Sequence, residues 1–455
     1  MIPLLAALLA LAAAPAATPP DDPAAQLRTP PKPATVKGRF TVVSVGDVML
    51  ARPQAANPDP ELQKVLALIR NADVAIGNQE GEALDPAVLT RGSTGPGGLI
   101  ASPAMAADYK AMGFDLMSVA NNHSVDWGAD GLLESLRLLD AAGVAHGGGG
   151  RSLAAAQAAG VYATPKGKVG LVATASTFKP SSIANDPLDG LGPRAGISLL
   201  RTRTVHLATP DTFAAVRRLA TDLASPLAPP PPPDSRQFSF ADQLWRLSDH
   251  PGLHYQMNPY DLTGLLKAVR AGKDAADLVV FHIHAHESPT GVDDDTPAPP
   301  DFLPILFHDA IDAGADMAMG GGPHSLRGVE IYRGKPVFYG LGLFFFKPQL
   351  RGAPDNLFDR FDAEGYPPEP DPRPNNPPGW YDSVLAVSTF EDGRLREVRL
   401  YPIDLKDPAV PSARGLPHLA HGERARAILE RLRRDSAPLG TTIVVDGEVG
   451  VVTVR

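Results

Sequence analysis

The pattern of apolar and polar positions alternates between short strand-like runs and helix-like segments over most of the chain. Residues 169–175 and 278–281 form unbroken runs of small and apolar residues, which predicts strands. Segments 60–69 and 131–142 repeat apolar residues at i, i+3 and i+4, which predicts amphipathic helices. The alternation predicts a layered α/β domain, with helices packed against a sheet.

Polar side chains that can bind metal ions follow five of the predicted strands. In open α/β sheets, ligands collect outside the carboxyl ends of the strands, so these side chains are expected to share one edge. In chain order the candidates are Asp47, Asn78, Glu80, Asn122, His123, Asp126, His282, His284, His286 and His324.

Imidazole, carboxylate and amide donors together suit Mn, Fe or Zn, whereas oxygen donors alone would favour Mg or Ca. Cysteine is absent from the sequence, which excludes thiolate sites, disulfides and cysteine nucleophiles. A divalent ion that activates water, beside an imidazole that moves a proton, predicts a metal-dependent hydrolase. A structural ion without turnover would use the same ligands.

Composition and the first residues narrow the partners and the location. With 51 acidic and 42 basic side chains and a net charge of -9, the chain lacks the basic surplus of a nucleic-acid-binding protein. Residues 1–17 combine an apolar run with small residues at its end, which predicts a signal peptide. We therefore expect an exported protein of the periplasm or cell envelope, soluble after cleavage. A non-secreted Ala-rich start is the alternative, because no basic residue precedes the run.

The sequence predicts one large domain with appendages. Residues 18–38 are rich in Pro and Ala and predict a flexible linker. The domain is expected over 39–405, with a Pro-rich insertion at about 225–260. Residues 406–455 are expected to add a helix over 423–434 and a strand over 441–454 as a C-terminal extension.

The motifs at the strand ends resemble the CapA family, the poly-gamma-glutamate capsule synthesis proteins, which are similar to calcineurin-like metallophosphoesterases. The resemblance implies a layered α/β/β/α metallophosphoesterase-like sandwich, here with Pro-rich loop insertions. The motifs lie between about Phe40 and Pro402, and five in one order are specific although each is weak alone. They are GDVML at 46–50, N-x-E at 78–80, ANNHSVDWG at 120–128, the His-rich end at 282–287, and GGPHSLRGVEIYRGKPVFYGLGLFFF at 321–346.

The resemblance also assigns roles to the candidate residues. His123 is expected to contact a phosphoryl oxygen or leaving group. Asp126 either orients His123 or caps the helix that begins at Gly128, and capping is the simpler interpretation. The expected metal ligands are Asp47, Glu80, Asn122, His284 and His324, with Asn78, Asp126, His282 and His286 as further candidates.

Two departures from the family pattern concern the number of ions. Met49 stands where the phosphoesterase pattern Asp-x-His has His, and Gly322 stands where many family members have His. Both departures affect the same metal position. We therefore expect one tightly bound ion, or one such ion and a second that binds more weakly. Strand alternation would place His282 and His286 on the face of His284, where either could compensate.

Three functions remain open at this level. The first is making, anchoring or processing an anionic polymer such as poly-gamma-glutamate, with membrane proteins of capsule synthesis as partners. The second is hydrolysis of a phosphate ester in the periplasm. The third is a binding scaffold that holds a metal ion without turnover.

Overall fold

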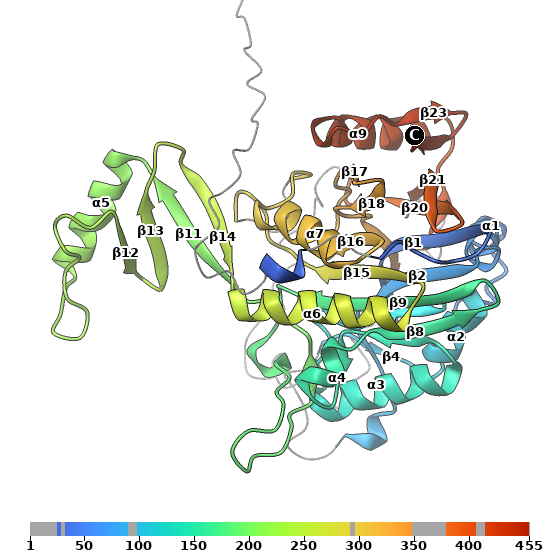
Figure 1. Ribbon diagram of the computed structural model, residues 1–455, viewed down its shortest axis with the longest axis horizontal. Helices are drawn as coiled ribbons and strands as arrows, with labels where there is room; N and C mark the ends of the chain where they lie inside the picture. The colour runs from blue at the N-terminus through green and yellow to red at the C-terminus, as the bar shows by residue number, and fades with distance from the viewer. Residues whose placement is uncertain are drawn as a thin grey trace, which may run out of the picture.

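Two large sheets pack face to face, helices cover their outer faces, and a small sheet projects from the body (Figure 1). The computed structural model describes residues 25–28, 32–89, 98–291, 296–347, 379–405 and 415–454. This arrangement confirms the layered α/β fold expected from the sequence.

The first sheet has a parallel half and an antiparallel half. Its parallel half carries the strand ends that matter for function, and its antiparallel half contains the hairpin that turns at Asp392 and Gly393. The strand order is β23 (Val444–Asp446), β24 (Val449–Thr453), β21 (Arg394–Asp404), β20 (Asp382–Glu391), β1 (Arg39–Leu50), β2 (Val74–Gln79), β5 (Leu116–Ser118) and β6 (Ala145–Gly147), with β19 (Leu343–Lys347) beside β1 and β22 (His418–Leu419) beside β21.

The second sheet is built around four parallel strands. Its strand order is β17 (Val329–Tyr332), β18 (Lys335–Phe338), β16 (Met317–Gly321), β15 (Leu278–His284), β9 (Gly167–Ala175) and β8 (Gly160–Thr164). Strand β15 pairs in parallel with β9 on one side and β16 on the other. The apolar runs predicted as strands are β9 and β15.

Helices cover the sheets as the periodic segments predict. In α1, Leu62, Leu66 and Ile69 are buried, and the Asp59 carboxylate accepts hydrogen bonds from the first free amides of the helix. The helices are α1 (Pro60–Arg70), α2 (Met105–Met112) and α3 (Gly128–Ala142) on the first sheet, α6 (Pro259–Ala275) and α7 (Phe302–Ala313) on the second, and α9 (Gly422–Ser436) against β21 and β17.

Short elements complete the body. They are the 3-10 turns η1 (Ala25–Leu27), η2 (Pro86–Val88), η3 (Pro180–Ser182) and η4 (Ala437–Leu439), helix α4 (Leu153–Gln157), and strands β3 (Glu82–Ala83), β4 (Ile100–Ala101), β7 (Gly149–Gly150) and β10 (Gly196–Ile197).

The main core lies between the two sheets. Val43 and Met317 belong to opposite sheets, are fully buried and share one apolar cluster, and Ser44 Oγ lies 3.9 Å from Met317 Sδ. Burial of each such apolar side chain contributes about 1.5–3 kcal/mol. This packing fixes the two sheets against each other, so polar residues at their strand ends are held in place.

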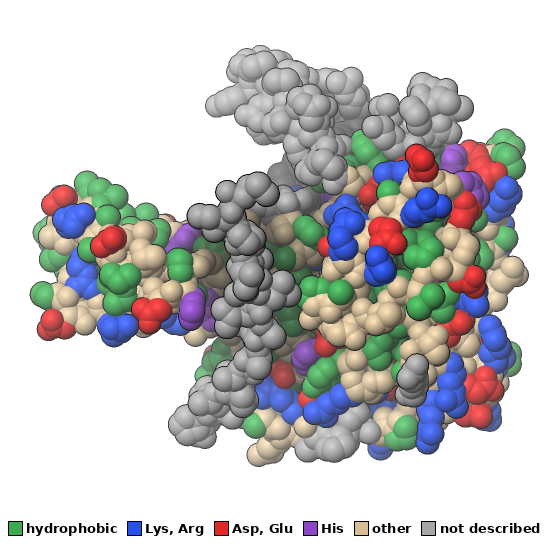
Figure 2. Space-filling model, turned by 90° about the horizontal axis from the view of Figure 1, so that it is seen from above, with side chains coloured by type: hydrophobic (Ala, Val, Ile, Leu, Met, Phe, Trp, Pro, Cys, Tyr) green, Lys and Arg blue, Asp and Glu red, His purple; other side chains and the backbone are tan. Residues whose placement is uncertain are grey.

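The insertion is larger and more ordered than expected. Residues 202–257 form a separate four-stranded sheet with one helix, so the insertion begins before residue 225, and it has its own core around Phe213 and Phe238. Figure 2 shows this unit standing apart from the body, with apolar, acidic and basic side chains interspersed on the visible face. Its elements are β11 (Thr202–Ala208), α5 (Pro210–Asp222), β12 (Gln237–Phe240), β13 (Gln243–Leu247) and β14 (Gly252–Met257).

The chain ends differ from expectation where they are described. Within the expected linker, Val36 is buried and Arg28 lies 2.6 Å from Asp309, so packed chain begins before Gly38. The expected strand over 441–454 is the hairpin β23–β24, and β24 pairs with β21 of the first sheet. The expected signal peptide lies outside the described residues. Among those described, no helix has the length and apolar character needed to cross a membrane.

Candidate metal centre

The carboxyl ends of the parallel strands of both sheets bring acids and imidazoles together. Asp47 lies within β1, Glu80 follows β2, and His284 ends β15. One donor atom from each of these three buried side chains lies within 4.8 Å of the other two. Nδ1 of His284 is 3.9 Å from Asp47 Oδ1, and its Nε2 is 3.9 Å from Glu80 Oε1. The ends of these strands therefore bring three candidate ligands close together.

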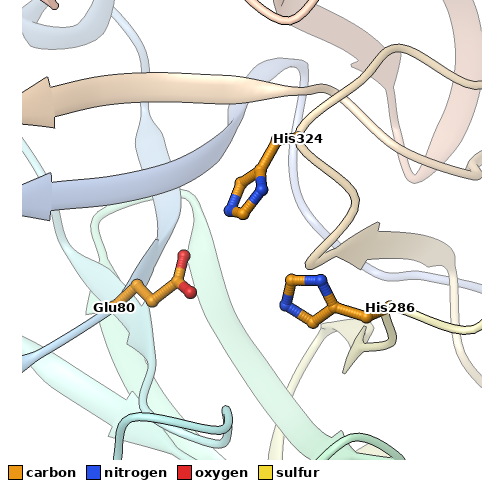
Figure 3. Close-up of side chains that lie close together, drawn as sticks. All are labelled: Glu80, His286 and His324. Carbon is orange, nitrogen blue, oxygen red and sulfur yellow. The ribbon is translucent and has the colours of Figure 1, made fainter. Parts of the chain in front are cut away.

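A second group of donors shares Glu80 with the first. Donor atoms of Glu80, His286 and His324 also lie within 4.8 Å of one another. Figure 3 shows the carboxylate and the two rings turned toward a common space. The two groups of three residues thus share the Glu80 carboxylate. His286 belongs to the second group, although the sequence indicated it only as a further candidate and His324 as an expected ligand.

The amide of Asn122 has the character expected of a ligand. Its Oδ1 is buried and accepts no hydrogen bond from any residue that the structure describes. A buried carbonyl oxygen left in this state costs free energy unless a cation or another donor reaches it. The neighbouring Asn121 is already engaged, since its Nδ2 donates to Gln79 O at 2.7 Å.

Asn78 orients two ligands. Its Nδ2 donates to Asp47 Oδ1 at 2.8 Å and lies 3.0 Å from Nδ1 of His284. Asn121 donates to Asn78 Oδ1 at 3.3 Å, which fixes the direction of the amide. Asn78 therefore positions Asp47 and His284.

Burial shifts the pKa values of the carboxyl and imidazole donors in opposite directions. Desolvation raises the pKa of the Asp47 carboxyl, although the Asn78 amide and the nearby His324 partly oppose this. Desolvation, with His286 and His282 beside it, holds the pKa of His284 well below its usual value. Neutral imidazoles are the form that binds metal, and a cation would relieve the cost of an ionised buried carboxylate. The donor set thus fits a divalent ion.

His282 does not join either group. Both of its ring nitrogens are buried without a hydrogen-bond partner among the described residues. A Cβ on Gly321 would lie 3.1 Å from its Nε2 and 2.6 Å from Asp47 Oδ1, so the ring sits beside Gly321, near the cluster. Neither donor group includes His282. Its assignment as a further ligand stays a prediction.

The burial of His282 predicts acid-sensitive stability of the metal-free protein. Desolvation lowers its pKa to about 3 from 6.5, so stability is complete above 6.5 and falls as pH drops toward 3. At pH 5 this one residue should cost about 2 kcal/mol, at about 1.4 kcal/mol per pH unit. Urea unfolding of chelator-treated wild type and His282→Leu at pH 7 and pH 5 measures the difference. Equal losses in both proteins would contradict the assignment.

His123 is held by a buried carboxylate. Its Nδ1 lies 2.8 Å from Asp126 Oδ2, and the same oxygen accepts a hydrogen bond from Leu99 N at 2.8 Å. The Lys179 ammonium pairs with Asp126 Oδ1. Because the carboxylate accepts only, Nδ1 of His123 carries a proton, and Nε2 lies 3.9 Å from Glu80 Oε1.

The simpler interpretation of Asp126 as a helix cap is wrong. Trp127 is the N-cap residue of α3 and makes no side-chain cap hydrogen bond. Glu82 instead accepts a hydrogen bond from Trp127 N at 2.7 Å, and burial raises the pKa of this acid well above its usual range. Asp126 therefore does not cap α3, and its carboxylate contacts His123 instead.

The two departures from the family pattern have structural causes. Gly322 has φ +105, its N donates to Asp47 Oδ2 at 3.0 Å, and a Cβ there would lie 2.9 Å from Ala285 N. Met49 is buried in an apolar cluster with Trp380 and Leu343. A side chain at position 322 would need the backbone to rearrange.

Sequence reasoning missed Lys179 and Trp380. Lys179 lies four residues beyond the end of β9, and its place after a predicted strand was the available signal. The Trp380 ring lies 4.3 Å from that of His324, yet nothing in the local sequence indicates this contact.

A layered α/β/β/α sandwich with acids and imidazoles buried at its strand ends is a metallophosphoesterase-like architecture. The chain belongs to the bacterial capsule synthesis protein family PGA_cap, whose model matches residues 41–348.

Three relatives illustrate this membership. The chain is 36% identical over 433 residues to the uncharacterized protein y4sH of Sinorhizobium fredii, covering 91% of this chain and 93% of the relative. It is 25% identical to the capsule biosynthesis protein CapA of Bacillus anthracis, over 68% of this chain and 60% of CapA. It is 28% identical to a probable polyglutamine synthesis accessory protein of Mycobacterium tuberculosis, over 50% of this chain and 43% of that protein.

Proposed function

We propose that this protein is a metal-dependent hydrolase that processes an anionic extracellular polymer during capsule synthesis. The observation that carries the proposal is the sharing of buried Glu80 by two groups of metal-binding donors. Family membership and the likeness to CapA support the link to capsule synthesis. The apolar residues 1–17 support export, which would bring the protein to such a polymer and to membrane proteins of its synthesis.

The residues divide between holding the ion and moving a proton. Asp47, Glu80, Asn122, His284 and His324 would hold Mn, Fe or Zn, which supplies a Lewis acid and lowers the pKa of water.

His123 would exchange a proton with the leaving group through Nε2. Its side chain is 26% exposed, whereas that of Glu80 is 1% exposed, so the ring faces the side from which substrate can arrive. The Asp126 carboxylate, fully buried and paired with Lys179, holds the ring in the tautomer that this task needs.

A substrate panel tests the proposal. We expect Mn-loaded protein to cleave a gamma-glutamyl oligomer, and chelation to abolish this cleavage. The panel also contains a phosphomonoester and a phosphodiester, because the fold resembles metallophosphoesterases. Turnover of the phosphate esters alone would show that the substrate is a phosphate ester and not the polymer. Metal binding without turnover of any member would contradict an enzymatic role and favour a scaffold.

A further inference from the structure

We infer that the seam between the two sheets, at the end opposite the metal centre, binds an extended chain of carboxylates. Strands β18 and β21, from different sheets, lie side by side here (Figure 1). A cavity of about 380 Å³ opens at this seam, and Asp316 lines it directly before β16 begins. His324 follows the other end of β16, whose five residues rise about 3.3 Å each, so the two sites lie on the order of 15 Å apart. The inference is therefore independent of the proposed metal centre.

The buried side of this cavity carries more positive than negative charge. The Asp316 carboxylate faces two ammonium groups, since its Oδ2 is 2.5 Å from Lys273 Nζ and its Oδ1 is 3.3 Å from Lys335 Nζ. Burial lowers the pKa of the Lys335 ammonium, so an anion beside it would stabilise its charged form. Arg333 also lines the cavity but pairs with Asp312 at 3.0 Å, so this pair adds no net charge.

Two arginines of β21 add positive charge at the rim. Arg394 and Arg396 line the cavity, are exposed, and form no ion pair with any residue that the structure describes. Leu395 between them is buried, so the two guanidinium groups lie on the same side of the strand. Glu391 stands opposite Arg394 in the hairpin without pairing with it. The chain as a whole has a net charge of -9, so this positive patch is a local exception.

The spacing of these cations fits a row of negative charges. Residues two apart on a strand lie about 6–7 Å from each other on one side of it. Arg394 and Arg396 have this spacing, and Lys335 lines the same cavity. A guanidinium group pairs with a carboxylate through two parallel hydrogen bonds. Separate cations along one wall therefore suit successive carboxylates of an extended chain better than one compact anion.

A second cavity lengthens the site. It has a volume of about 700 Å³ and shares Gly334 and Val454 with the first cavity. Thr442 and Thr453 supply hydroxyl groups to its wall, and the side chain of Val444 in β23 is exposed there. Among the described strands, β23 is the edge of the first sheet, so one row of its backbone groups would pair with amides of a bound chain. The adjoining cavities thus offer cations at one end and neutral hydrogen-bonding groups at the other.

Titration calorimetry with a gamma-glutamyl oligomer tests the inference. The protein is treated with chelator and desalted, so that no metal binds the oligomer. We expect binding to wild type that weakens as salt concentration rises. Binding should be about 10-fold weaker in Arg394→Gln and in Arg396→Gln, because each loses a charged hydrogen-bond donor. Arg399→Gln is the matched control and should bind as wild type, since Arg399 lies on the same strand but pairs with Glu397 at 2.7 Å and lines neither cavity.

A compact anion and a folding check complete the test. Inorganic tripolyphosphate is the second probe, and thermal melts show that each variant is folded, as expected for exposed positions. Absence of oligomer binding to wild type, or equal binding by wild type and both cavity variants, would overturn the inference. Binding of tripolyphosphate without the oligomer would also overturn it, because the site would then recognise a compact anion. None of these outcomes bears on the proposed hydrolase, since the protein is free of metal throughout.

Discussion

Glu80→Gln is expected to leave the protein almost free of metal. Glu80 belongs to both donor groups, so its loss removes a ligand from each position at once. Replacement of residues that merely support ligands costs about 10- to 100-fold in metal affinity, and loss of a shared ligand should exceed about 100-fold. Mn content after equilibration and desalting, measured by mass spectrometry beside the wild type, gives the result.

Glu82→Gln is the control for this prediction. Glu82 is a buried acid two residues away, and it accepts the Trp127 amide hydrogen bond but belongs to neither donor group. Its amide replacement should bind as much metal as wild type. If Glu80→Gln retained wild-type metal, or both variants lost it equally, the shared-carboxylate description would be wrong.

His123→Gln should reduce turnover by about 10²- to 10⁴-fold while metal content stays unchanged. This is the range that a positioned general acid or base contributes. The ring belongs to neither donor group, and its Nε2 is 3.9 Å from the nearest Glu80 oxygen, so its removal should spare the ligands. The rate constant kcat on the best substrate of the panel and the metal content of the same sample are measured together.

Asp126→Asn separates positioning from the chemical step. The amide removes the buried charge that holds the His123 tautomer, so turnover should fall while the ring remains. An undiminished kcat in His123→Gln would remove the proposed acid or base. Loss of metal in that variant would show instead that His123 is a ligand.

The convergence of three candidate ligands was predictable because it follows from strand topology. Parallel strands end at one edge, so Asp47, Glu80 and His284 could be assigned to a single site from their places after apolar runs. His324 could be assigned in the same way, because it follows β16. These assignments required only the order of strands and the residue types at their ends.

The histidines after β15 could not be sorted from sequence. Alternation treats His282, His284 and His286 alike, as members of one continuing strand. The strand ends at His284, so His286 lies in the irregular segment after it, whereas His282 is buried within the strand beside Gly321. Where a strand stops depends on hydrogen bonds to distant residues such as Thr177.

The predictions for Asp126 and for the insertion were wrong for a related reason. A carboxylate before a helix is a good cap in local terms, but Lys179, which is distant in sequence, pairs with Asp126. The Pro-rich residues near 229–233 identified only part of the insertion, since β11 lies before them and pairs with β13 and β14 after them. Local signals could not report these long-range pairings.

Anomalous diffraction from crystals grown with Mn would show where the ion binds. We expect a peak contacted by Asp47, Glu80 and His284, close to the Asn122 amide. Density for Mn elsewhere on the surface, with these side chains contacting only protein or water, would show that they do not form a metal centre.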